Sequence, residues 1–526
     1  MDPFIQGLLR PEAYPHPVGR FQVLETHISW VILTGDYAYK LKKPVNLGFV
    51  DFTTLARRRQ FCDEEIRLNR RLAPELYLGV QPVFGTRQQP TLCGVGEPIE
   101  YAVQMRQFDQ SDLLPAVLER GELSRDQAFH LAETVATFHR RIAVASGEAP
   151  FGTPEAIQAD MKDNFQVLEK LPDERGSVGA LRQWSEQEFG RRQDWFTSRR
   201  ETGHIRECHG DLHLGNMFRL NDAVQVFDCL EFNPSLRWID VVSEIAFLVM
   251  DLQERGSPNL AAMVLNRWLE QTGDYGGMTG WRWYFVYRAL VRAKVAALRL
   301  QQPDLSSPER TAKQGELKAY LALAQTYTGK RPSAIVVMHG FSGSGKSFVS
   351  QRICEEFGAI RLRSDIERKR LFGKWGDPGS RQLAGDMYAA NVTETLYGEI
   401  LAELVPHIVE GGFSAVIDAA SLQRWQRELF RTIAAQLALP FVLIDLHAEP
   451  ALLHQRLQQR RITTPVDPSD ADIAVLESQW AAHEPLSTGE QLAALAVDTG
   501  TADWWAKLSQ ELTQALVSDP QSRRVK

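Results

Sequence analysis

The chain has 526 residues, of which 44% are hydrophobic and 24% charged, and these proportions exclude a largely disordered protein. The net charge of −7 argues against a protein that coats nucleic acid, because such binding requires a basic surface. We therefore expect no nucleic-acid partner, and the length predicts about two to four domains.

The cysteines and the apolar segments indicate where the protein works. The cysteines are scattered and form no C-x-x-C pair, so neither a disulfide framework nor a zinc site is expected. No apolar stretch approaches the ~20 residues of a membrane span, and residues 1–4 lack the basic and apolar regions of a signal peptide. We expect a cytoplasmic protein without a membrane partner. The cysteines are Cys62, Cys93, Cys208, Cys229 and Cys354.

The first part of the chain carries short strand signals followed by helical ones. Residues 30–33 and 37–41 are apolar runs on either side of a Thr-Gly-Asp turn. From residue 123 to about residue 300, apolar residues recur at helical spacing. The pattern predicts a small sheet-rich lobe and a larger helical lobe, which together form a two-lobed α+β domain over residues 1–300.

A polar loop near residue 210 has the spacing of a kinase catalytic loop. His209, Asp211 and Asn216 form the pattern H-x-D-x-x-x-x-N, in which the Asp takes a hydroxyl proton and the Asn holds Mg²⁺. Asp228 ends a short apolar strand, where a second metal-binding carboxylate belongs. The alternative is a metal pair formed by His209 and His213, although no third ligand has suitable spacing.

This loop resembles the signature of the aminoglycoside phosphotransferase and choline kinase family, His-Gly-Asp-Leu-His-x-x-Asn. The similarity continues through Phe227-Asp228-x-x-Glu231 and Trp238-Ile239-Asp240 and covers about residues 20–300. It implies a protein-kinase-like fold with Asp211 as the catalytic base, Asn216 and Asp228 as metal ligands, and Asp240 bracing the loop from below.

The small lobe must supply the lysine that holds the α- and β-phosphates and the helix glutamate that pairs with it. The run Ala38-Tyr39-Lys40 gives Lys40, and Lys42 on the same strand face is the alternative. The helix expected over residues 57–72 offers Glu65, with Glu64 as its rival. No G-x-G-x-x-G lies between the first strands, so the phosphate cover is not identified. His139 is interpreted as a core histidine, and residues 104–108 as the hinge that reads adenine.

Residues 301–332 form the clearest seam in the chain. A turn-rich stretch precedes a short helix predicted over residues 312–327, and Gly329 and Pro332 follow it. We interpret 301–332 as a linker, 333–515 as a second domain and 516–526 as a C-terminal tail. Apolar runs then alternate with helices, which predicts an α/β domain with a parallel sheet. The runs are 335–338, 360–362, 415–417, 441–446 and 495–497.

The sharpest motif, G-x-x-x-x-G-K-S, follows the first of these runs and precedes a helical pattern. Its glycines let backbone N–H groups surround a phosphate, its lysine reaches the β- and γ-phosphates, and its serine hydroxyl ligates Mg²⁺. The motif therefore predicts a nucleotide-binding P-loop. Its residues are Gly340, Phe341, Ser342, Gly343, Ser344, Gly345, Lys346 and Ser347.

Two further acids lie where neighbouring strands end. Asp418 follows the run 415–417 and is predicted to orient the metal, the alternative being a strand-end Asp that caps a turn. Asp365 follows the run 360–362 and is placed to accept the proton of an attacking hydroxyl.

These pieces resemble the small-molecule P-loop kinases grouped with gluconate kinase, polynucleotide 5′-kinase and zeta toxin in the AAA_33 ATP-binding domain. The resemblance covers roughly residues 333–500. It implies Asp365 as the base, Arg456 and Arg460 in a lid that closes over the phosphates, and Asp470 and Asp472 capping that lid. A solvated helix face is the alternative for the arginines. The matched pieces are 340–347, Arg363-Ser364-Asp365-x-x-Arg368, Val416-Ile417-Asp418-Ala419 and Arg456-Leu457-x-x-Arg460-Arg461.

The sequence therefore predicts an ATP-dependent kinase with two kinase-type domains. ATP and Mg²⁺ are the expected cofactors, and the hydroxyl of a small molecule such as a sugar, an aminocyclitol or a nucleotide sugar is the expected acceptor. The alternatives are a regulatory ATP-binding protein with one catalytic domain and a zeta-toxin-like kinase with a fused regulatory domain.

Overall fold

A computed structural model describes residues 2–48, 50–302, 305–375, 387, 389–463, 473–501 and 503–517, without the side chains of residues 172, 460–463 and 517. The chain divides into two compact units. The first comprises Met1–Ile157 and Thr197–Asp251, and the second comprises Gln158–Phe196 and Leu252–Lys526. The divisions fall within α5 (Pro154–Leu168), α7 (Gln193–Glu201) and α8 (Val241–Glu254). None of the helices within these described ranges has both the length and the hydropathy needed to cross a membrane.

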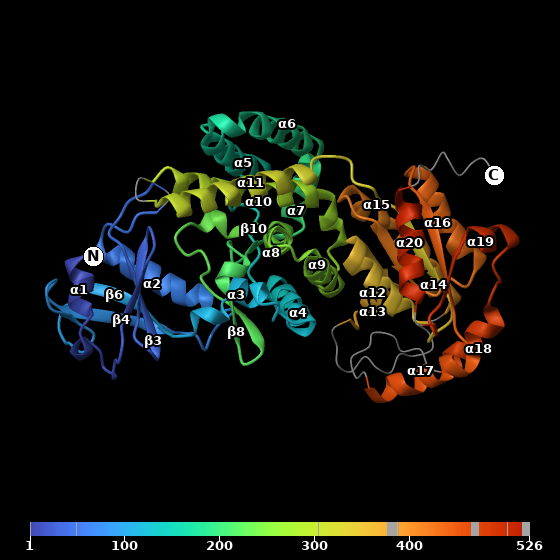
Figure 1. The fold of residues 1–526 in the computed structure, drawn as a ribbon, viewed down its shortest axis with the longest axis horizontal. Coiled ribbons are helices and arrows are strands. Elements are labelled where there is room, and N and C mark those ends of the chain that lie inside the picture. Colours follow the sequence, from blue (N-terminus) through green and yellow to red (C-terminus); the bar gives the residue numbers. More distant parts are fainter. Residues whose placement is uncertain are drawn as a thin grey trace. The chain divides into compact units, whose positions relative to one another are not determined.

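The first unit begins with a six-stranded antiparallel sheet in the order β1-β2-β3-β6-β4-β5 (Figure 1). In β2, Trp30 and Ile32 pack into a core with α1, whereas Val31 and Leu33 pack into a core with α2, because successive strand residues face opposite sides. The sheet-rich first lobe predicted from the sequence is confirmed. The elements are α1 (Pro3–Leu8), β1 (Gln22–Glu25), β2 (Ser29–Leu33), β3 (Tyr37–Lys42), α2 (Leu55–Asn69), β4 (Tyr77–Gly85), β5 (Pro90–Thr91) and β6 (Glu100–Arg106).

The rest of the first unit consists of helices and short two-stranded pairs. The α4 helix begins at a capping box formed by Ser124 and Gln127, and its apolar face is buried at Ala132, Val135 and Ala136, as the helical spacing of apolar residues in this region predicts. The strands pair as β7 with β10 and as β8 with β9. The elements are α3 (Leu114–Glu119), α4 (Arg125–Arg141), β7 (Ile205–Glu207), β8 (Met217–Leu220), β9 (Ala223–Val226) and β10 (Trp238–Asp240), with 3₁₀ turns at Pro11–Ala13, Gln110–Asp112, Leu214–Asn216 and Pro234–Leu236.

Helices dominate the second unit before its sheet. The helix predicted over residues 312–327 is α11 (Ser307–Thr326), which starts earlier because Ser306 and Glu309 form a capping box and Pro308 lies in the first turn. Its buried face packs against α10. The elements are α6 (Arg175–Arg191), α9 (Pro258–Thr272), α10 (Trp281–Leu300) and α11, with 3₁₀ turns at Pro172–Glu174 and Tyr275–Gly280.

A five-stranded parallel sheet follows, in the order β12-β13-β11-β14-β15. Each strand contains the apolar run that predicted it, and the helices α12 and α20 share its core, so the parallel sheet is confirmed. The strands are β11 (Ile335–His339), β12 (Ile360–Arg363), β13 (Ala415–Asp418), β14 (Phe441–His447) and β15 (Leu495–Asp498). The helices are α12 (Lys346–Phe357), α13 (Ser364–Leu371), α14 (Ala390–Thr395), α15 (Ala402–Glu410), α16 (Arg424–Gln436), α17 (Pro450–Thr463), α18 (Ile473–Ala482), α19 (Thr488–Ala493) and α20 (Trp504–Val517), with a π-helical stretch at Leu396–Leu401.

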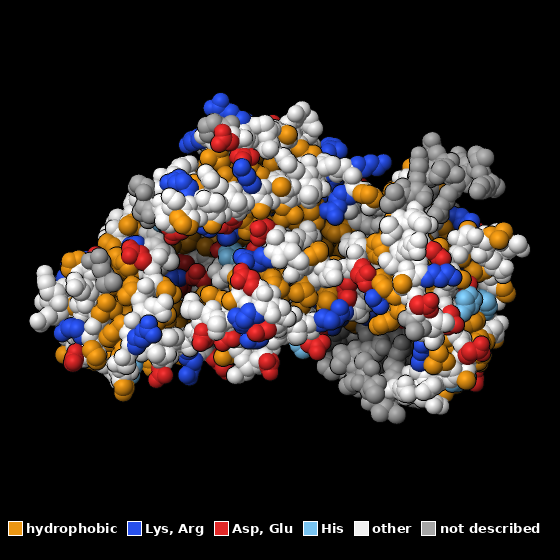
Figure 2. Space-filling model, viewed as in Figure 1, with side chains coloured by type: hydrophobic (Ala, Val, Ile, Leu, Met, Phe, Trp, Pro, Cys, Tyr) orange, Lys and Arg blue, Asp and Glu red, His pale blue; other side chains and the backbone are white. Residues whose placement is uncertain are grey.

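The surface carries charges of both signs. On the face drawn in Figure 2, acidic and basic side chains are interspersed over the described residues. No single sign of charge dominates this face.

Candidate active sites

The first candidate site is the loop between β7 and β8, which carries Asp211. The Asp211 carboxylate accepts a hydrogen bond from Asn216 Nδ2 at 2.9 Å, and His213 Nε2 lies 3.3 Å from the same oxygen. His213 Nδ1 accepts the N–H of Gly215, so its proton is on Nε2 and points to Asp211. With 32% of its side chain exposed, Asp211 is both oriented by neighbours and open to a reactant.

His209 stabilises the same loop from within. Its Nε2 donates to the carbonyl of Phe227 at 2.8 Å, and its Nδ1 accepts the N–H of Asp211 at 3.3 Å. Burial lowers the pKa of His209, which keeps the ring neutral, as these two bonds require. Because both ring nitrogens are occupied, the metal pair with His213 considered from the sequence is wrong.

The β8–β9 hairpin brings Asn216 and Asp228 to the same end of two paired strands. The turn is formed by Asn221 and Asp222, both left-handed, and at the open end Phe227 N–H donates to the Asn216 carbonyl at 3.0 Å. The backbone of Asp228 also adopts the left-handed conformation, with φ 63°. This conformation costs a non-glycine residue energy and often marks a functional site.

Hydrogen bonds from the sheet-rich lobe hold Asp228 in that conformation. The Asp228 N–H donates to the hydroxyl of Tyr77 at 3.1 Å, and the following Cys229 N–H donates to Asn69 Oδ1 at 2.8 Å. Tyr77 and Asn69 are buried. Sequence reasoning missed both residues, because their role depends on which loop packs against them.

Lys40 lies between the acid of the helix and the acid of the hairpin. Its Nζ is 2.8 Å from Glu65 Oε1 and 2.5 Å from Asp228 Oδ1. Burial lowers the pKa of Lys40, but the carboxylates of Asp228 and Glu65 outweigh it and raise that pKa well above its usual value. Burial likewise raises the pKa of Glu65, yet Lys40 and Lys42 lower it to about 2. The site is therefore charged, with every buried charge paired.

The alternatives left by the sequence occupy different places. Lys42 is deeper than Lys40 and pairs with Glu65 at 2.7 Å and with Glu231. Glu64 lies on the other side of α2, where it contacts Arg67 and Arg237. Of the two lysines, Lys40 is the one whose ammonium contacts both Glu65 and Asp228.

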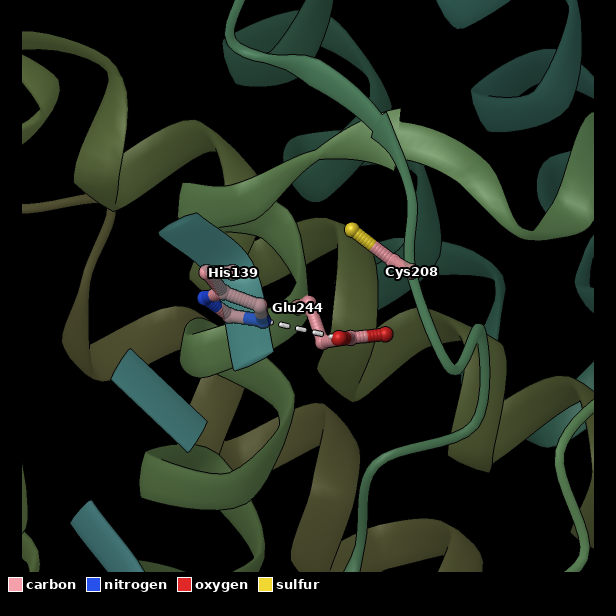
Figure 3. A group of neighbouring side chains, drawn as sticks. All are labelled: His139, Cys208 and Glu244. Carbon is pink, nitrogen blue, oxygen red and sulfur yellow. Dashed lines mark hydrogen bonds and ion pairs between the residues drawn. The ribbon is translucent and has the colours of Figure 1, made fainter. Parts of the chain in front are cut away.

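The underside of the loop is supported by α8. Glu244 accepts the Gly210 N–H at 2.7 Å and binds His139 Nε2 at 2.8 Å, as Figure 3 shows for the histidine. Possible ligand atoms of His139, Cys208 and Glu244 lie within 4.8 Å of one another. Since both Glu244 oxygens already accept hydrogen bonds, this buried cluster is explained as support for the loop without a metal.

Two more acids lie on or directly before α8. Asp251, seven residues after Glu244, accepts the Leu214 N–H at 2.8 Å. Asp240, expected to brace the loop, binds Arg199 in a bidentate pair and accepts the Val242 N–H at the start of α8. Sequence reasoning missed Glu244 and Asp251, although acids within the apolar stretch of residues 244–252 were a usable signal.

The turn between β1 and β2 takes the place of a glycine-rich phosphate loop. The Thr26 hydroxyl accepts the N–H groups of Ile28 and Ser29 at 3.3 and 3.0 Å and closes the turn on itself. The described residues of this turn therefore form no glycine-rich loop like that of the second site.

The second candidate site lies where β11 leads into α12. Gly340, Gly343 and Gly345 adopt positive φ values of 146°, 84° and 96°, which side chains disfavour. A Cβ on Gly343 would lie 3.0 Å from the carbonyl of Leu453, and one on Gly340 would lie 2.8 Å from that of Leu446. Lys346 Nζ donates to the carbonyls of Gly340 and Phe341 at 2.9 and 2.7 Å. The predicted strand–turn–helix is present.

Ser347 and Asp418 provide hard oxygens beside this loop. Ser347 Oγ lies 3.5 Å from Asp418 Oδ1. Asp418 Oδ2 is buried and, among the described residues, accepts no hydrogen bond, while Arg363 Nε and Arg361 Nη1 lie 3.6 and 3.9 Å away. A buried carboxylate oxygen without a donor, next to a serine hydroxyl, is a suitable donor set for Mg²⁺.

The remaining residues lie around the same strand ends. Asp365 is half-buried in the first turn of α13, and β12 pairs in register with β13 so that Arg363 lies opposite Asp418. Arg456 of α17 binds the Gly343 carbonyl at 3.2 Å and Thr499 Oγ1 at 2.8 Å. This contact replaces the solvated helix face considered for Arg456.

Some of the arginines and aspartates predicted from the sequence in this region have side chains that the structure does not describe. Arg460 lies on α17 one turn after Arg456, but its side chain and that of Arg461 are outside the described residues. Asp470 and Asp472 also lie outside them. Thr499 was missed by sequence reasoning. Its position directly after the last strand was the available signal.

Two family models match separate parts of the chain. Residues 50–284 match the phosphotransferase enzyme family, and residues 335–486 match an AAA domain. The first match contains the Asp211 loop and the second contains the P-loop. A protein-kinase-like fold is thus followed by a P-loop domain, as the two sequence resemblances implied. Two kinase-type domains support a phosphotransferase, and such domains imply ATP binding.

Uncharacterized proteins of Mycobacterium bovis and Mycobacterium tuberculosis are 29% identical to this chain over 432 residues, which cover 80% of this chain and 82% of each relative. Among solved structures, a gluconokinase from Sinorhizobium meliloti is 22% identical, covers 38% of this chain and all of its own, and has a TM-score of 0.24. A choline/ethanolamine kinase family protein from Mesorhizobium loti is 12% identical, covers 61% of this chain and 98% of its own, and has a TM-score of 0.34.

Proposed function

We propose that this chain, which joins a phosphotransferase-family domain to a P-loop AAA domain, transfers the γ-phosphoryl group of ATP to hydroxyl groups of small molecules. The observation that carries the proposal is the position of Lys40, whose ammonium contacts both Glu65 and Asp228. Asp228 and Asn216 flank the two ends of the β8–β9 hairpin, and Asn216 in turn contacts Asp211. A phosphate-binding cation, a metal-binding acid and a base are thereby assembled from separate segments.

In the first site, Asp211 is the proposed base. Its carboxylate is held by Asn216 and His213 and takes the proton of the acceptor hydroxyl as that oxygen attacks the γ-phosphorus. Lys40, oriented by Glu65, binds the α- and β-phosphates and offsets the charge that collects on the leaving ADP. This geometry orients the nucleophile and supplies positive charge where negative charge develops.

In the second site, the P-loop N–H groups and Lys346 bind the phosphates, and Arg456 of α17, which contacts the Gly343 carbonyl, is the proposed lid residue. Lys346 now binds loop carbonyls, so we expect it to exchange these for phosphate oxygens when nucleotide enters. Asp365, after the neighbouring strand, is the proposed base for the acceptor hydroxyl.

Mg²⁺ is the proposed metal at both sites. Asn216 and Asp228 would hold it in the first site, and Ser347 and Asp418 in the second, where an Asp418 oxygen accepts no hydrogen bond among the described residues. When bound, the ion neutralises charge on the phosphates.

The cysteines that the structure describes are all free, which supports our proposal that the protein works in a reducing compartment, the cytoplasm.

The test is transfer of labelled phosphate from γ-labelled ATP to a panel of sugars, aminocyclitols, amino alcohols and nucleotide sugars. We expect transfer by the full chain, and loss of one set of products in Asp211→Asn and of another in Asp365→Asn. Asp222→Asn, in the exposed turn of the β8–β9 hairpin, and Asp503→Asn, exposed before α20, are the matched controls. Unchanged products in both active-site variants would refute the proposal.

A second candidate function is nucleotide sensing by the first domain. The Thr26 turn favours it, because this turn does not provide the loop of N–H groups that usually covers the phosphates. Under this alternative, ATP would bind the first site, no acceptor would depend on Asp211, and Asp228→Asn would change the activity that depends on Asp365.

A further inference from the structure

Strand β12 is an edge of the parallel sheet, and helix α9 covers it. The Asn266 side chain donates to the Ala359 carbonyl at 2.9 Å and accepts the Arg361 N–H at 2.8 Å, so one carboxamide takes the place of a neighbouring strand. The hydroxyl of Tyr275 donates to the Arg361 carbonyl at 3.3 Å. Helix α9 also packs on α12, the helix that follows the P-loop (Figure 1).

One turn after Asn266, Glu270 places a carboxylate beside the same strand. Its Oε1 accepts a hydrogen bond from Arg361 Nη2 at 2.7 Å, and Arg267 Nη1 lies 3.1 Å from its other oxygen. Both Glu270 and Arg361 are nearly inaccessible, with side-chain exposures of 1% and 5%. A buried charge of this kind needs a partner of opposite sign.

The other side of the Arg361 guanidinium faces the P-loop site. Arg361 Nη1 donates to the Ser347 carbonyl at 3.1 Å and lies 3.9 Å from Asp418 Oδ2, while Arg363 Nε is 3.6 Å from that oxygen. Two guanidinium groups therefore lie close to the one carboxylate that is proposed to bind metal. Each competes with a divalent cation for Asp418 and repels it.

Glu270 counters this effect, because its hydrogen bond directs one Arg361 nitrogen away from Asp418. Burial raises the pKa of Glu270, but Arg361, Arg363 and Arg267 together lower it below the usual value, so the carboxylate is ionised. Its negative charge offsets one of the two guanidinium charges near Asp418.

We propose that Glu270 is a positioning residue for the metal site of the P-loop domain: it holds the Arg361 guanidinium and so leaves Asp418 available to a divalent cation. The inference rests on the proposed function of the P-loop. Glu270 lies within the residues that match the phosphotransferase family, whereas Arg361 and Asp418 lie within those that match the AAA domain. A helix of the first matched segment thus contributes to the nucleotide site of the second.

The experiment measures ADP binding by calorimetry at a series of Mg²⁺ concentrations. The full chain carries Asp228→Asn throughout, so that the metal-dependent signal comes from the P-loop. We expect Glu270→Gln to raise the Mg²⁺ concentration for half-maximal tightening about tenfold, with ADP affinity in the absence of Mg²⁺ not reduced. Adding Arg361→Met should restore the Mg²⁺ dependence to within about twofold of the parent.

The double variant separates positioning from structural support. If Glu270 only stabilised the fold, removing Arg361 as well would not restore the Mg²⁺ dependence. Glu490→Gln is the matched control, because Glu490 forms a buried pair with Arg427 at 2.6 Å on another helix, and it should leave the Mg²⁺ dependence unchanged. Glu270→Asp keeps the charge and should shift the dependence less than Glu270→Gln. If Glu270→Gln does not fold, the same measurements are made on Glu270→Asp, alone and combined with Arg361→Met.

The two proposals fail in different ways. If ADP binding in the Asp228→Asn parent is insensitive to Lys346→Ala, the proposed function of the P-loop is wrong. If binding requires Lys346 but the Mg²⁺ dependence is the same with and without the Glu270 substitution, the P-loop function stands and the role of Glu270 is overturned. The role of Glu270 is also overturned if Arg361→Met does not restore the Mg²⁺ dependence of ADP binding in the Glu270→Gln variant.

Discussion

At the scale of single residues, Asn69 shows how one buried amide connects the two halves of the first site. Its Nδ2 donates to the Glu65 carbonyl at 2.9 Å, and its Oδ1 accepts the N–H of Cys229, which follows Asp228. We expect Asn69→Leu to lower the free energy of unfolding by about 1–3 kcal/mol, because it leaves a buried N–H without an acceptor. Chemical denaturation and ADP binding at the first site measure the two consequences.

A matched control for this substitution lies in α5. Asn164 is fully buried, and its amide nitrogen and oxygen have no partner among the described residues. Asn164→Leu should therefore be neutral or stabilising, since it removes polar atoms that gain nothing from burial. Equal losses of stability in the two variants would show that the hydrogen bonds of Asn69 carry no special weight.

The neutral state of His209 makes the first site sensitive to acid. Its folded-state pKa is lowered by burial, so the unfolded chain binds the proton more readily and stability is lost as the pH falls below about 6.5. The loss is at most about 1.4 kcal/mol per pH unit until the folded pKa is reached. A proton on Nδ1 would also face the Asp211 N–H, from which that nitrogen now accepts.

We expect the stability difference between the wild type and His209→Gln to be largest near pH 8 and to shrink toward pH 5. The glutamine does not titrate, so the wild type alone pays the protonation cost. Denaturant unfolding at several pH values gives the difference directly. A difference that stays constant from pH 8 to pH 5 would mean that His209 does not change its protonation in this range.

The residue scale also shows what the sequence could reveal about the sites. Asp211 and Asn216 are in contact because their spacing lies within one loop, and such local spacing is readable. Lys40 and Lys42 share a strand face, so periodicity could not separate them. The structure separates them because Lys42 pairs with the buried Glu231. Glu270 reaches the P-loop site from another part of the chain, and no local pattern indicates such a partner.

At the scale of elements, the buried strands were predictable because both faces of a parallel sheet are covered and each strand is a continuous apolar run. All five runs after residue 332 became strands, each including its predicted run. Their order in the sheet was not predictable, because it depends on where the crossovers place each strand. The contact of α9 with the edge of β12 was not predictable either, because nothing in the sequence distinguishes Asn266 from other polar residues in a helix.

The P-loop element allows a matched pair of glycine substitutions. Gly343 and Gly358 both have positive φ, at 84° and 63°, so Ala at either position costs about 1–2 kcal/mol of backbone strain. A Cβ at 343 would also lie 3.0 Å from the Leu453 carbonyl of α17, whereas one at 358 would meet nothing within 4 Å. We expect Gly343→Ala to weaken ADP binding at least tenfold and Gly358→Ala to leave it unchanged, at similar losses of thermal stability. Equal ADP affinities would show that this loop does not bind phosphate as proposed.

At the scale of the whole molecule, the compact units do not coincide with the two family matches. The second unit contains residues 158–196 and 252–284, which match the phosphotransferase family, together with the entire AAA match. Sequence motifs mark the chemistry of each half, but a family boundary says nothing about which helices pack on which sheet. The helices α9 and α10 carry the signature of neither motif and still belong to the unit that contains the P-loop.

This division predicts how an isolated P-loop fragment will behave. A fragment of residues 333–526 lacks α9, so the backbone groups of β12 that bind Asn266 and Tyr275 become an uncovered strand edge. Uncovered edges pair with other copies, and the fragment also loses the carboxylate of Glu270 next to Arg361. We expect it to self-associate in sedimentation velocity experiments and to bind ADP with Mg²⁺ at least tenfold more weakly than the full chain.

Asn266→Leu in the full chain separates the loss of these hydrogen bonds from the exposure of the strand edge, because α9 still covers β12 in this variant. That variant should lose about 1–3 kcal/mol of stability without associating. A monomeric fragment with the ADP affinity of the full chain would show that the P-loop domain is complete without the first matched segment.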